Sequence, residues 1–298
     1  MPDRLLLITA DDFGIGPETS RGILDLAELG VVRSTVLLVT SPFARDGVRQ
    51  WRRRGCPVEL GWHPCLTLDS PVCSPDLVPS LVDRRGRFHT LGRFLLRLMQ
   101  GRIRESEIES ELSAQYIRFL DLTEQLPRNV NCHHHLQVFA PVRRALMHIL
   151  EGQEPVPFVR RVVESRATLN GVPGGRLKRL LLSRFGQSRS YAFPGNDELI
   201  GVTDPPCVHD PRFFMNWLAA STGRTVELTC HPGHFDRTLV GRDGSLTDGQ
   251  IQRRVVEYER LSDPGLDRAI RDAGFQPIDA AGITTGAASA GIPLSSVA

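Results

Sequence analysis

The stretch LLLITADDFG, residues 5–14, decides the fold. It opens with a short apolar run, Leu5–Thr9, which is typical of a strand buried on both faces of a parallel sheet. Asp11 and Asp12 follow almost at once. Adjacent carboxylates at the end of a buried strand repel each other unless a cation or a proton relieves the repulsion. An aspartate can also cap a helix, but capping explains one such residue well and two poorly.

Outward from this stretch, strand and helix patterns alternate along the chain. Further strands are predicted at residues 35–39, 58–62, 129–133, 158–163 and 225–230. Helices are predicted at residues 17–29, 105–125, 211–220 and 248–261, with another starting at Pro141. This alternation predicts an α/β fold with a parallel sheet and helices packed outside it. About seven such units favour closure into a barrel rather than an open nucleotide-binding sheet. No dinucleotide-binding or P-loop motif follows a predicted strand, so the sequence gives no support for either chemistry.

Two segments interrupt the alternation. Residues 70–93 are rich in Pro, Ser, Asp and Gly and predict a long loop. Residues 166–196 contain the basic and apolar stretch 176–184 (RLKRLLLSR), which could be a solvated helix, a lid or a peripheral contact with anionic lipid headgroups. The small, polar residues 281–298 are expected to form a mobile tail, which leaves residues 1–280 as a single domain.

Composition excludes several classes of partner and location. The formal net charge of the 298 residues is +2, too weak to indicate a nucleic-acid partner. No stretch approaches the roughly 18 apolar residues of a transmembrane span, and the N-terminus lacks the features of a signal peptide. The six cysteines form no CxxC pair, as expected of free thiols in a reducing compartment. We therefore expect a cytoplasmic protein.

Histidines gather in three clusters, each after a predicted strand. His63 lies in GWHPCLT (61–67), three consecutive histidines lie in NCHHH (131–135), and His231 lies in TCHPGHFD (229–236). Each cluster alone could be structural, since a lone histidine usually is and three together could form a solvated loop. However, the carboxyl ends of parallel strands face the ligand in such folds. The three histidine clusters and the Asp11–Asp12 pair, each at the end of a predicted strand, therefore predict one functional site.

The residue types in these clusters predict a catalytic metal centre. Neutral imidazole suits zinc and other borderline divalent ions, and alternation along a strand would turn His133 and His135 to the same face. One Asp and two His from three strand ends would leave positions open for water and substrate, which is the pattern of a catalytic site. His231 need not be a ligand and could act as an acid or a base.

In their order and spacing, these motifs resemble those of the YdjC-like (ChbG/HpnK) carbohydrate deacetylase family. The motifs that carry the resemblance are ADDFG (10–14), GVVRST (30–35), GWHPCLT (61–67), ELSAQ (111–115), NCHHHLQ (131–137) and ELTCHP (227–232). The resemblance runs from about residue 5 to about residue 236. Asn131 stands where many members have Asp, and Gln137 stands where many have His.

The resemblance implies a distorted (β/α) barrel related to polysaccharide deacetylases. It implies one divalent metal ion, often assigned as Mg²⁺, with Zn²⁺ or another divalent ion also open. By the same resemblance Asp12, His63 and His133 would hold the metal, and Asp11 would be the catalytic base. The implied reaction removes the N-acetyl group from an N-acetylated amino sugar in an oligosaccharide or a glycolipid.

Three further residues complete the predicted site. His231, as imidazolium, is expected to protonate the departing amine. Arg160, which follows Phe158 and Val159 of the predicted strand, and His135 are candidate substrate contacts. The sequence leaves open whether the protein forms a homodimer.

Two alternative functions remain. A metal-dependent phosphoesterase also uses clustered His and Asp, but such sites usually hold two or three metals and need more bridging carboxylates than the sequence offers. A degenerate member that binds a glycan without turnover is the second, suggested by Asn131 and Gln137.

Overall fold

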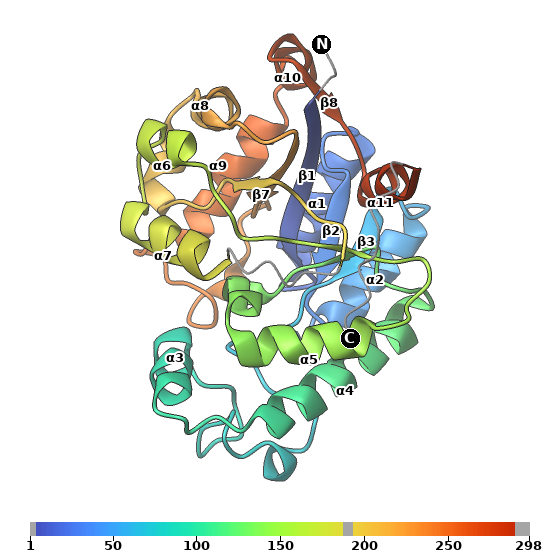
Figure 1. Cartoon of the computed structure of the whole chain (residues 1–298), viewed down its shortest axis with the longest axis vertical. Helices are drawn as coiled ribbons and strands as arrows, with labels where there is room; N and C mark the ends of the chain where they lie inside the picture. The colour runs from blue at the N-terminus through green and yellow to red at the C-terminus, as the bar shows by residue number, and fades with distance from the viewer. Residues whose placement is uncertain (1–3, 187–192, 290–298) are drawn as a thin grey trace.

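A parallel sheet curled into a distorted barrel forms the centre of the protein, with helices packed outside it (Figure 1). The computed structural model describes residues 4–186 and 193–289. The strands are β1 (Arg4–Phe13), β2 (Ser34–Leu37), β3 (Glu59–Trp62), β4 (Asn129–Val130), β5 (Phe158–Val159), β6 (Glu198–Ile200), β7 (Thr225–Cys230) and β8 (Phe275–Pro277). Their order is β5-β4-β3-β2-β1-β7-β6, and the short β8 pairs with β1. The predicted α/β barrel of about seven strands is therefore confirmed.

Helices follow most of the strands and cover the outside of the barrel (Figure 1). They are α1 (Pro17–Glu28), α2 (Ala44–Arg53), α3 (Leu91–Met99), α4 (Glu105–Thr123), α5 (Ala140–Leu150), α6 (Arg166–Gly171), α7 (Arg176–Gly186), α8 (Phe213–Ala220), α9 (Gln250–Leu261), α10 (Leu266–Asp272) and α11 (Ala280–Ser289). Short 3₁₀ turns are η1 (Pro75–Leu77), η2 (His133–Val138), η3 (Pro205–His209) and η4 (Arg237–Leu239). In the described part of the chain, no helix combines the length and the apolar character needed to cross a bilayer.

Strand β1 lies inside the sheet, between β2 and β7. Its residues from Leu6 onward are all buried, which explains why its sequence is a continuous apolar run rather than an alternating one. Leu6 and Ile8 belong to the main hydrophobic core, whereas Leu7 packs in a smaller cluster with Phe158. The strand is therefore covered on both faces.

The barrel closes irregularly between β5 and β6. The Val159 amide donates to the Pro194 carbonyl at 2.8 Å, and the Leu199 amide donates to the Val163 carbonyl at 2.7 Å. The Asn196 side-chain oxygen accepts from the Arg161 amide at 2.8 Å. These separate bonds replace a regular ladder at this seam, so the barrel is distorted.

Strand β1 is longer than predicted and contains both aspartates. It extends to Phe13, and its pairing with β2 shifts register between Ala10 and Phe13. Asp12 lies at this irregularity with a φ of +67°, a left-handed conformation that is uncommon outside glycine. The bulge interrupts the regular alternation of side chains along the strand at Asp12.

Residues 281–289, part of the segment expected to form a mobile tail, form most of α11. The Glu59 side chain accepts hydrogen bonds from the amides of Ala280 and Ala281 and so caps the start of this helix. Ile283 packs in the cluster that contains Leu7 and Phe158. Burial of this side chain and the cap stabilise a helix that the small, polar composition did not suggest. Residues 290–298 lie outside the described residues.

The two interrupting segments differ in structure. Residues 70–93 are largely loop, with η1 and a bridge between Val82 and Phe88. Residues 166–196 contain α6 and α7, so the stretch 176–184 is helical. Residues 187–192 of this segment lie outside the described residues.

Candidate metal centre

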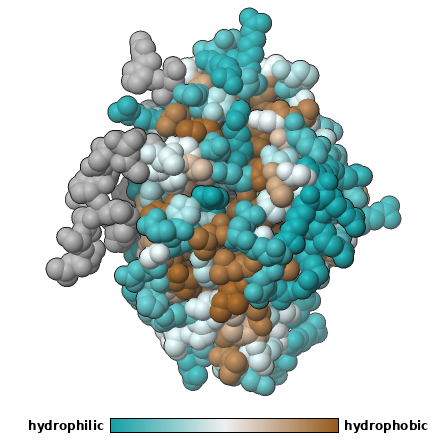
Figure 2. Space-filling view, turned by 90° about the vertical axis from the view of Figure 1, so that its right-hand side faces the viewer, coloured by the Kyte–Doolittle hydropathy of each residue, from teal (hydrophilic) through white to brown (hydrophobic). Residues whose placement is uncertain are grey.

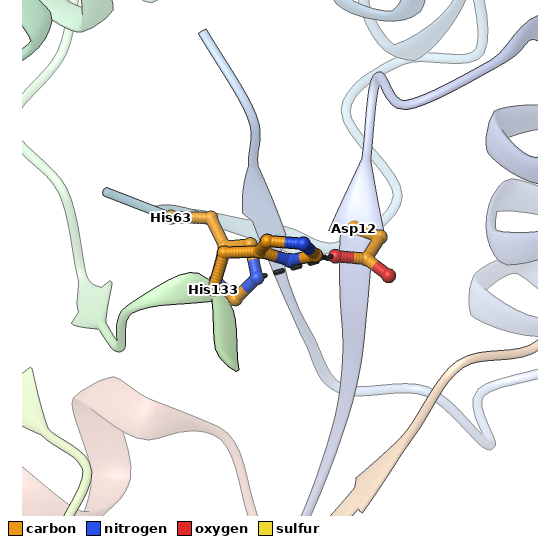
Figure 3. Close-up of side chains that lie close together, drawn as sticks. All are labelled: Asp12, His63 and His133. Carbon is orange, nitrogen blue, oxygen red and sulfur yellow. Dashed lines mark hydrogen bonds and ion pairs between the residues drawn. The ribbon is translucent and has the colours of Figure 1, made fainter. Parts of the chain in front are cut away.

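Three side chains from separate strand ends meet beside β1 (Figure 3). Asp12 lies on β1, His63 follows β3, and His133 begins η2 after β4. The Asp12 Oδ1 atom lies 3.2 Å from His63 Nε2 and 3.0 Å from His133 Nδ1. All three side chains are buried, and one ligand atom from each lies within 4.8 Å of the others. The structure thus brings together the three residues that the resemblance implied.

The hydrogen bonds of His63 indicate that this group fits a cation. His63 Nδ1 lies 2.7 Å from the main-chain oxygen of Asn131, and a carbonyl oxygen only accepts, so Nδ1 carries the hydrogen. In a neutral ring, His63 Nε2 then points a lone pair at the Asp12 carboxylate. Two acceptors at 3.2 Å repel each other unless the ring is charged or a cation lies between them. A carboxylate and two imidazoles are the donor set of a divalent ion.

The prediction that His133 and His135 share one face of a strand is wrong. Strand β4 ends at Val130, and the three histidines begin the turn η2, in which His134 and His135 have φ of 56°. His134 Nδ1 bonds the Thr67 hydroxyl at 2.9 Å. In this turn only His133 reaches Asp12. His135 is buried, and its Nδ1 has no hydrogen-bond partner among the described residues.

Asp11 is held by a buried ionic network. Arg160 donates to both Asp11 oxygens, at 2.6 and 2.8 Å, and to Glu227 at 2.8 Å. The Thr229 hydroxyl donates to Asp11 Oδ2 at 2.9 Å. Burial alone would raise the pKa of Asp11, but the Arg160 guanidinium outweighs it and lowers that pKa below its ordinary value. Asp11 is therefore a carboxylate at neutral pH.

The burial of Arg160 argues against the substrate contact predicted from the sequence. Its side chain is 0% exposed, and it donates to the Asn131 side-chain oxygen as well as to Asp11 and Glu227. Every one of these contacts lies inside the barrel. A side chain so enclosed can act on a sugar only through its neighbours.

Arg254, on α9, belongs to the site and has no counterpart in the predicted set. It donates to Asp12 Oδ2 at 2.6 Å and to Asp243 at 2.8 Å. Burial would raise the pKa of Asp12, but Arg254 and His133 together bring it well below its ordinary value. Asp12 therefore uses one oxygen toward Arg254 and the other toward the two histidines.

His231 follows β7 and is the most exposed of the predicted site residues, with 26% of its side chain accessible. Its Nε2 atom lies 4.0 Å from Asp11 Oδ2, and its Nδ1 accepts from Arg253 at 3.3 Å. Burial and the Arg253 charge lower the pKa of His231 well below its ordinary value. The ring is therefore neutral at neutral pH, with its hydrogen on Nε2.

The sequence prediction missed several site residues, and only some of them lie in a sequence pattern that could have identified them. Glu227 and Thr229 stand two residues apart on β7, with His231 two further on, so strand alternation places them on one face. Glu227 is the one charged residue of β7, and a charge inside a predicted buried strand was a usable signal for it. Arg254 lies on an amphipathic helix rich in charged residues, and no local pattern separates it from its neighbours.

The other family motifs have structural roles around the site. The ELSAQ motif on α4 binds backbone groups of the loop after His63. Glu111 accepts a hydrogen bond from the Cys73 amide. The Gln115 side chain accepts from the Cys65 amide and donates to the Cys65 carbonyl. Gln137 accepts from the Cys132 amide at 3.1 Å and so supports the turn before His133. These contacts hold the ligand-bearing loops in place.

The fold and the site define a parallel α/β barrel with an Asp–His–His centre at the carboxyl ends of its strands. The model of the family described as YdjC-like protein matches residues 5–272, so the chain belongs to this family, as the resemblance predicted. A chitooligosaccharide deacetylase from Klebsiella pneumoniae is 28% identical over 92% of this chain and 97% of its own length. A carbohydrate deacetylase from Enterococcus faecalis is 27% identical over 92% of this chain and 96% of its own length.

A solved structure shows the same fold. It is that of a putative cellobiose-phosphate cleavage protein from Enterococcus faecalis, with a TM-score of 0.73 and 24% identity. The match covers 94% of this chain and 98% of that one. The whole barrel is therefore shared with this structure.

Proposed function

We propose that the protein is a metal-dependent carbohydrate deacetylase, which hydrolyses the N-acetyl group of an amino sugar in an oligosaccharide or a glycolipid. The observation that carries the proposal is the convergence of Asp12, His63 and His133 beside the carboxylate of Asp11. Two relatives named as deacetylases match nearly the whole chain and support the substrate class.

One divalent cation is proposed at Asp12, His63 and His133. When bound, it would polarise the acetamide carbonyl and lower the pKa of a water molecule. The family resemblance suggests Mg²⁺, but Mg²⁺ prefers oxygen ligands, whereas two imidazole nitrogens favour Zn²⁺ or a similar ion. Arg254 keeps Asp12 ionised and oriented for this role.

Asp11 is the proposed base and Arg160 its positioning residue. Asp11 takes a proton as the oxygen of water forms a bond to the carbonyl carbon, and the bond from carbon to nitrogen then breaks. Arg160 fixes both carboxylate oxygens and keeps them charged before the reaction. The proton collected by Asp11 is then available to the departing amine, so that the products are acetate and a free amino group.

His231 is proposed to donate a hydrogen bond from Nε2 to the reacting acetamide. Its neutral form follows from burial and from the Arg253 hydrogen bond to Nδ1. A neutral imidazole is a weak acid, so this role differs from the imidazolium acid expected from the sequence. The buried Nδ1 of His135, on the neighbouring turn, makes that residue a second proposed substrate contact.

An acetate-release assay tests the proposed activity directly. We expect metal-loaded protein to release acetate from at least one of chitobiose, peptidoglycan fragments and N-acetylglucosaminyl lipids, with one tightly bound ion per chain by mass spectrometry. Two or three ions together with phosphate release from an ester would favour a phosphoesterase. One ion with no acetate released from any of these compounds would favour a glycan-binding protein without turnover.

Substituting Arg160 with methionine is expected to move the acid limb of the pH–rate profile upward. Arg160 is the main group that opposes the effect of burial on Asp11, so its loss raises the pKa of that carboxyl. Because the base works as a carboxylate, kcat/KM would fall at mildly acidic pH and recover as the pH rises. Arg160→Lys, which keeps the charge, should give a smaller shift. A profile with an unchanged acid limb in a folded Arg160→Met variant would contradict this role.

We also propose that the protein works in the cytoplasm. All six cysteines are unpaired, which supports a reducing compartment. Burial raises the pKa of the Cys65 thiol to about 12, so this cysteine, close to His63 in the chain, is a packing residue rather than a nucleophile.

A further inference from the structure

Helix α7 has the reverse of the usual amphipathic arrangement. Its buried residues are Arg179, Ser183 and Gly186, and its outer face carries large apolar side chains. The exposed fractions are 71% for Leu177, 53% for Leu180, 49% for Leu181 and 51% for Phe185. These are four of the twelve large hydrophobic side chains that are exposed in the described part of the chain. Such a concentration is typical of an interaction surface rather than of a solvated helix.

The inward face anchors the helix firmly to the barrel. The Arg179 guanidinium pairs with Glu164 at 2.5 Å, donates to the Val172 and Thr168 carbonyls, and lies 4.4 Å from the centre of the Trp217 ring. A side-chain carbon on Gly186 would lie only 2.0 Å from the Val162 carbonyl oxygen, so the helix end packs directly on the backbone. Rotation of α7 to bury its leucines would break this network. The apolar face is therefore held outward.

The charges around the apolar stripe define the chemistry of its partner. Arg176, Lys178 and Arg184 are exposed on α7, and the helix contains no acidic residue. Leucine and phenylalanine side chains beside cationic ones are the composition of a helix that lies in the interface of an anionic bilayer. A second copy of the chain fits less well, because a two-fold contact through α7 would bring the same cations together.

The surface lies next to the metal centre. Helix α7 contacts η2, the turn that begins at His133, and the rings of Phe185 and Phe139 lie 5.7 Å apart. In Figure 1, α7 lies beside α6, on the opposite side of the barrel from α2 and α11. Figure 2 shows the other side of the molecule, the right-hand side of Figure 1, where hydrophobic residues lie in groups interrupted by hydrophilic ones.

We propose that the outer face of α7, formed by Leu177, Leu180, Leu181 and Phe185 with the cations beside them, docks the protein on an anionic lipid bilayer. Docking there would hold the metal centre close to the lipid headgroups. The proposal adds a membrane partner to the proposed deacetylase, but it does not depend on turnover.

Vesicle co-sedimentation of the full chain tests the docking surface. We expect binding to vesicles of equal parts phosphatidylcholine and phosphatidylglycerol, and much weaker binding to phosphatidylcholine alone. The double variant Leu180→Ser/Leu181→Ser should lower the partition coefficient at least about tenfold. A matched control, Leu29→Ser/Ile117→Ser, removes two side chains that are 62% and 58% exposed, one just after α1 and one on α4, and should bind like the unmodified protein.

The outcomes separate docking from the proposed activity. Because the assay contains no sugar, a protein that binds vesicles but releases no acetate would support docking while overturning the deacetylase proposal. Absence of binding to the mixed vesicles, or equal loss of binding in both double variants, would overturn docking. If Leu180→Ser/Leu181→Ser instead converted a dimer to a monomer in light scattering without changing vesicle binding, the surface would be a contact between copies, and the docking proposal would be wrong.

Discussion

Substituting His63 with alanine is expected to lower kcat/KM by about a thousandfold or more and to abolish tight binding of the catalytic cation. His63 supplies one of only two imidazoles in the centre, and its Nε2 faces Asp12 Oδ1 at 3.2 Å. The Asn131 carbonyl fixes the orientation of the ring through Nδ1. Without it the site would keep one carboxylate and one imidazole, too few ligands for a tight site.

The matched control for this variant is His148→Ala. His148 lies on α5, and its side chain is 70% exposed. Its removal should change neither metal content nor kcat/KM. Far-UV circular dichroism should show that both variants keep the fold, because the interactions of β1 with β2 and β7 do not involve either side chain. Full activity in His63→Ala would show that the metal ligands have been misassigned.

Substituting Asp11 with asparagine is expected to lower kcat by about a hundredfold to ten-thousandfold while leaving metal binding intact. The amide has nearly the shape of the carboxylate but cannot accept a proton from water. Arg160 would lose one of its two bonds to this residue, because the amide nitrogen is a donor. Asp12, His63 and His133 would still face one another.

The two variants are expected to separate metal binding from activity. His63→Ala should lose both the ion and activity, whereas Asp11→Asn should lose activity alone. Thr229→Val provides a milder control, since it removes one hydrogen bond to Asp11 but leaves Arg160 in place. An Asp11→Asn variant with near-normal kcat, or one that no longer binds the ion, would contradict the assignment of Asp11 as the base.

Much of the fold could be predicted because its signals are local. Strand β1 is buried on both faces, so its apolar run is continuous, whereas β7 shows the alternating pattern of a strand in TVELTC. The parallel order follows from alternation with helices. Once the strands are placed, the positions of His63 and His231 at strand ends can also be predicted, because both residues come directly after a buried strand.

The parts that could not be predicted depend on long-range packing. Strand β4 is only two residues long, and His134 and His135 after it are left-handed, so the predicted alternation fails at His135. Arg254 reaches Asp12 from a helix 242 residues along the chain, and Arg160 is buried against Asp11 across 149 residues. Helix α11 forms because Glu59 caps it, and this contact links residues far apart in sequence.

Anomalous diffraction from crystals grown with Zn²⁺ or Mn²⁺ is the most direct test of the metal centre. The expected result is one strong anomalous peak within coordination distance of an Asp12 oxygen, a His63 nitrogen and a His133 nitrogen, and loss of that peak in His63→Ala. A peak that lies elsewhere, or a fully loaded crystal in which these three side chains contact no ion, would contradict the central claim.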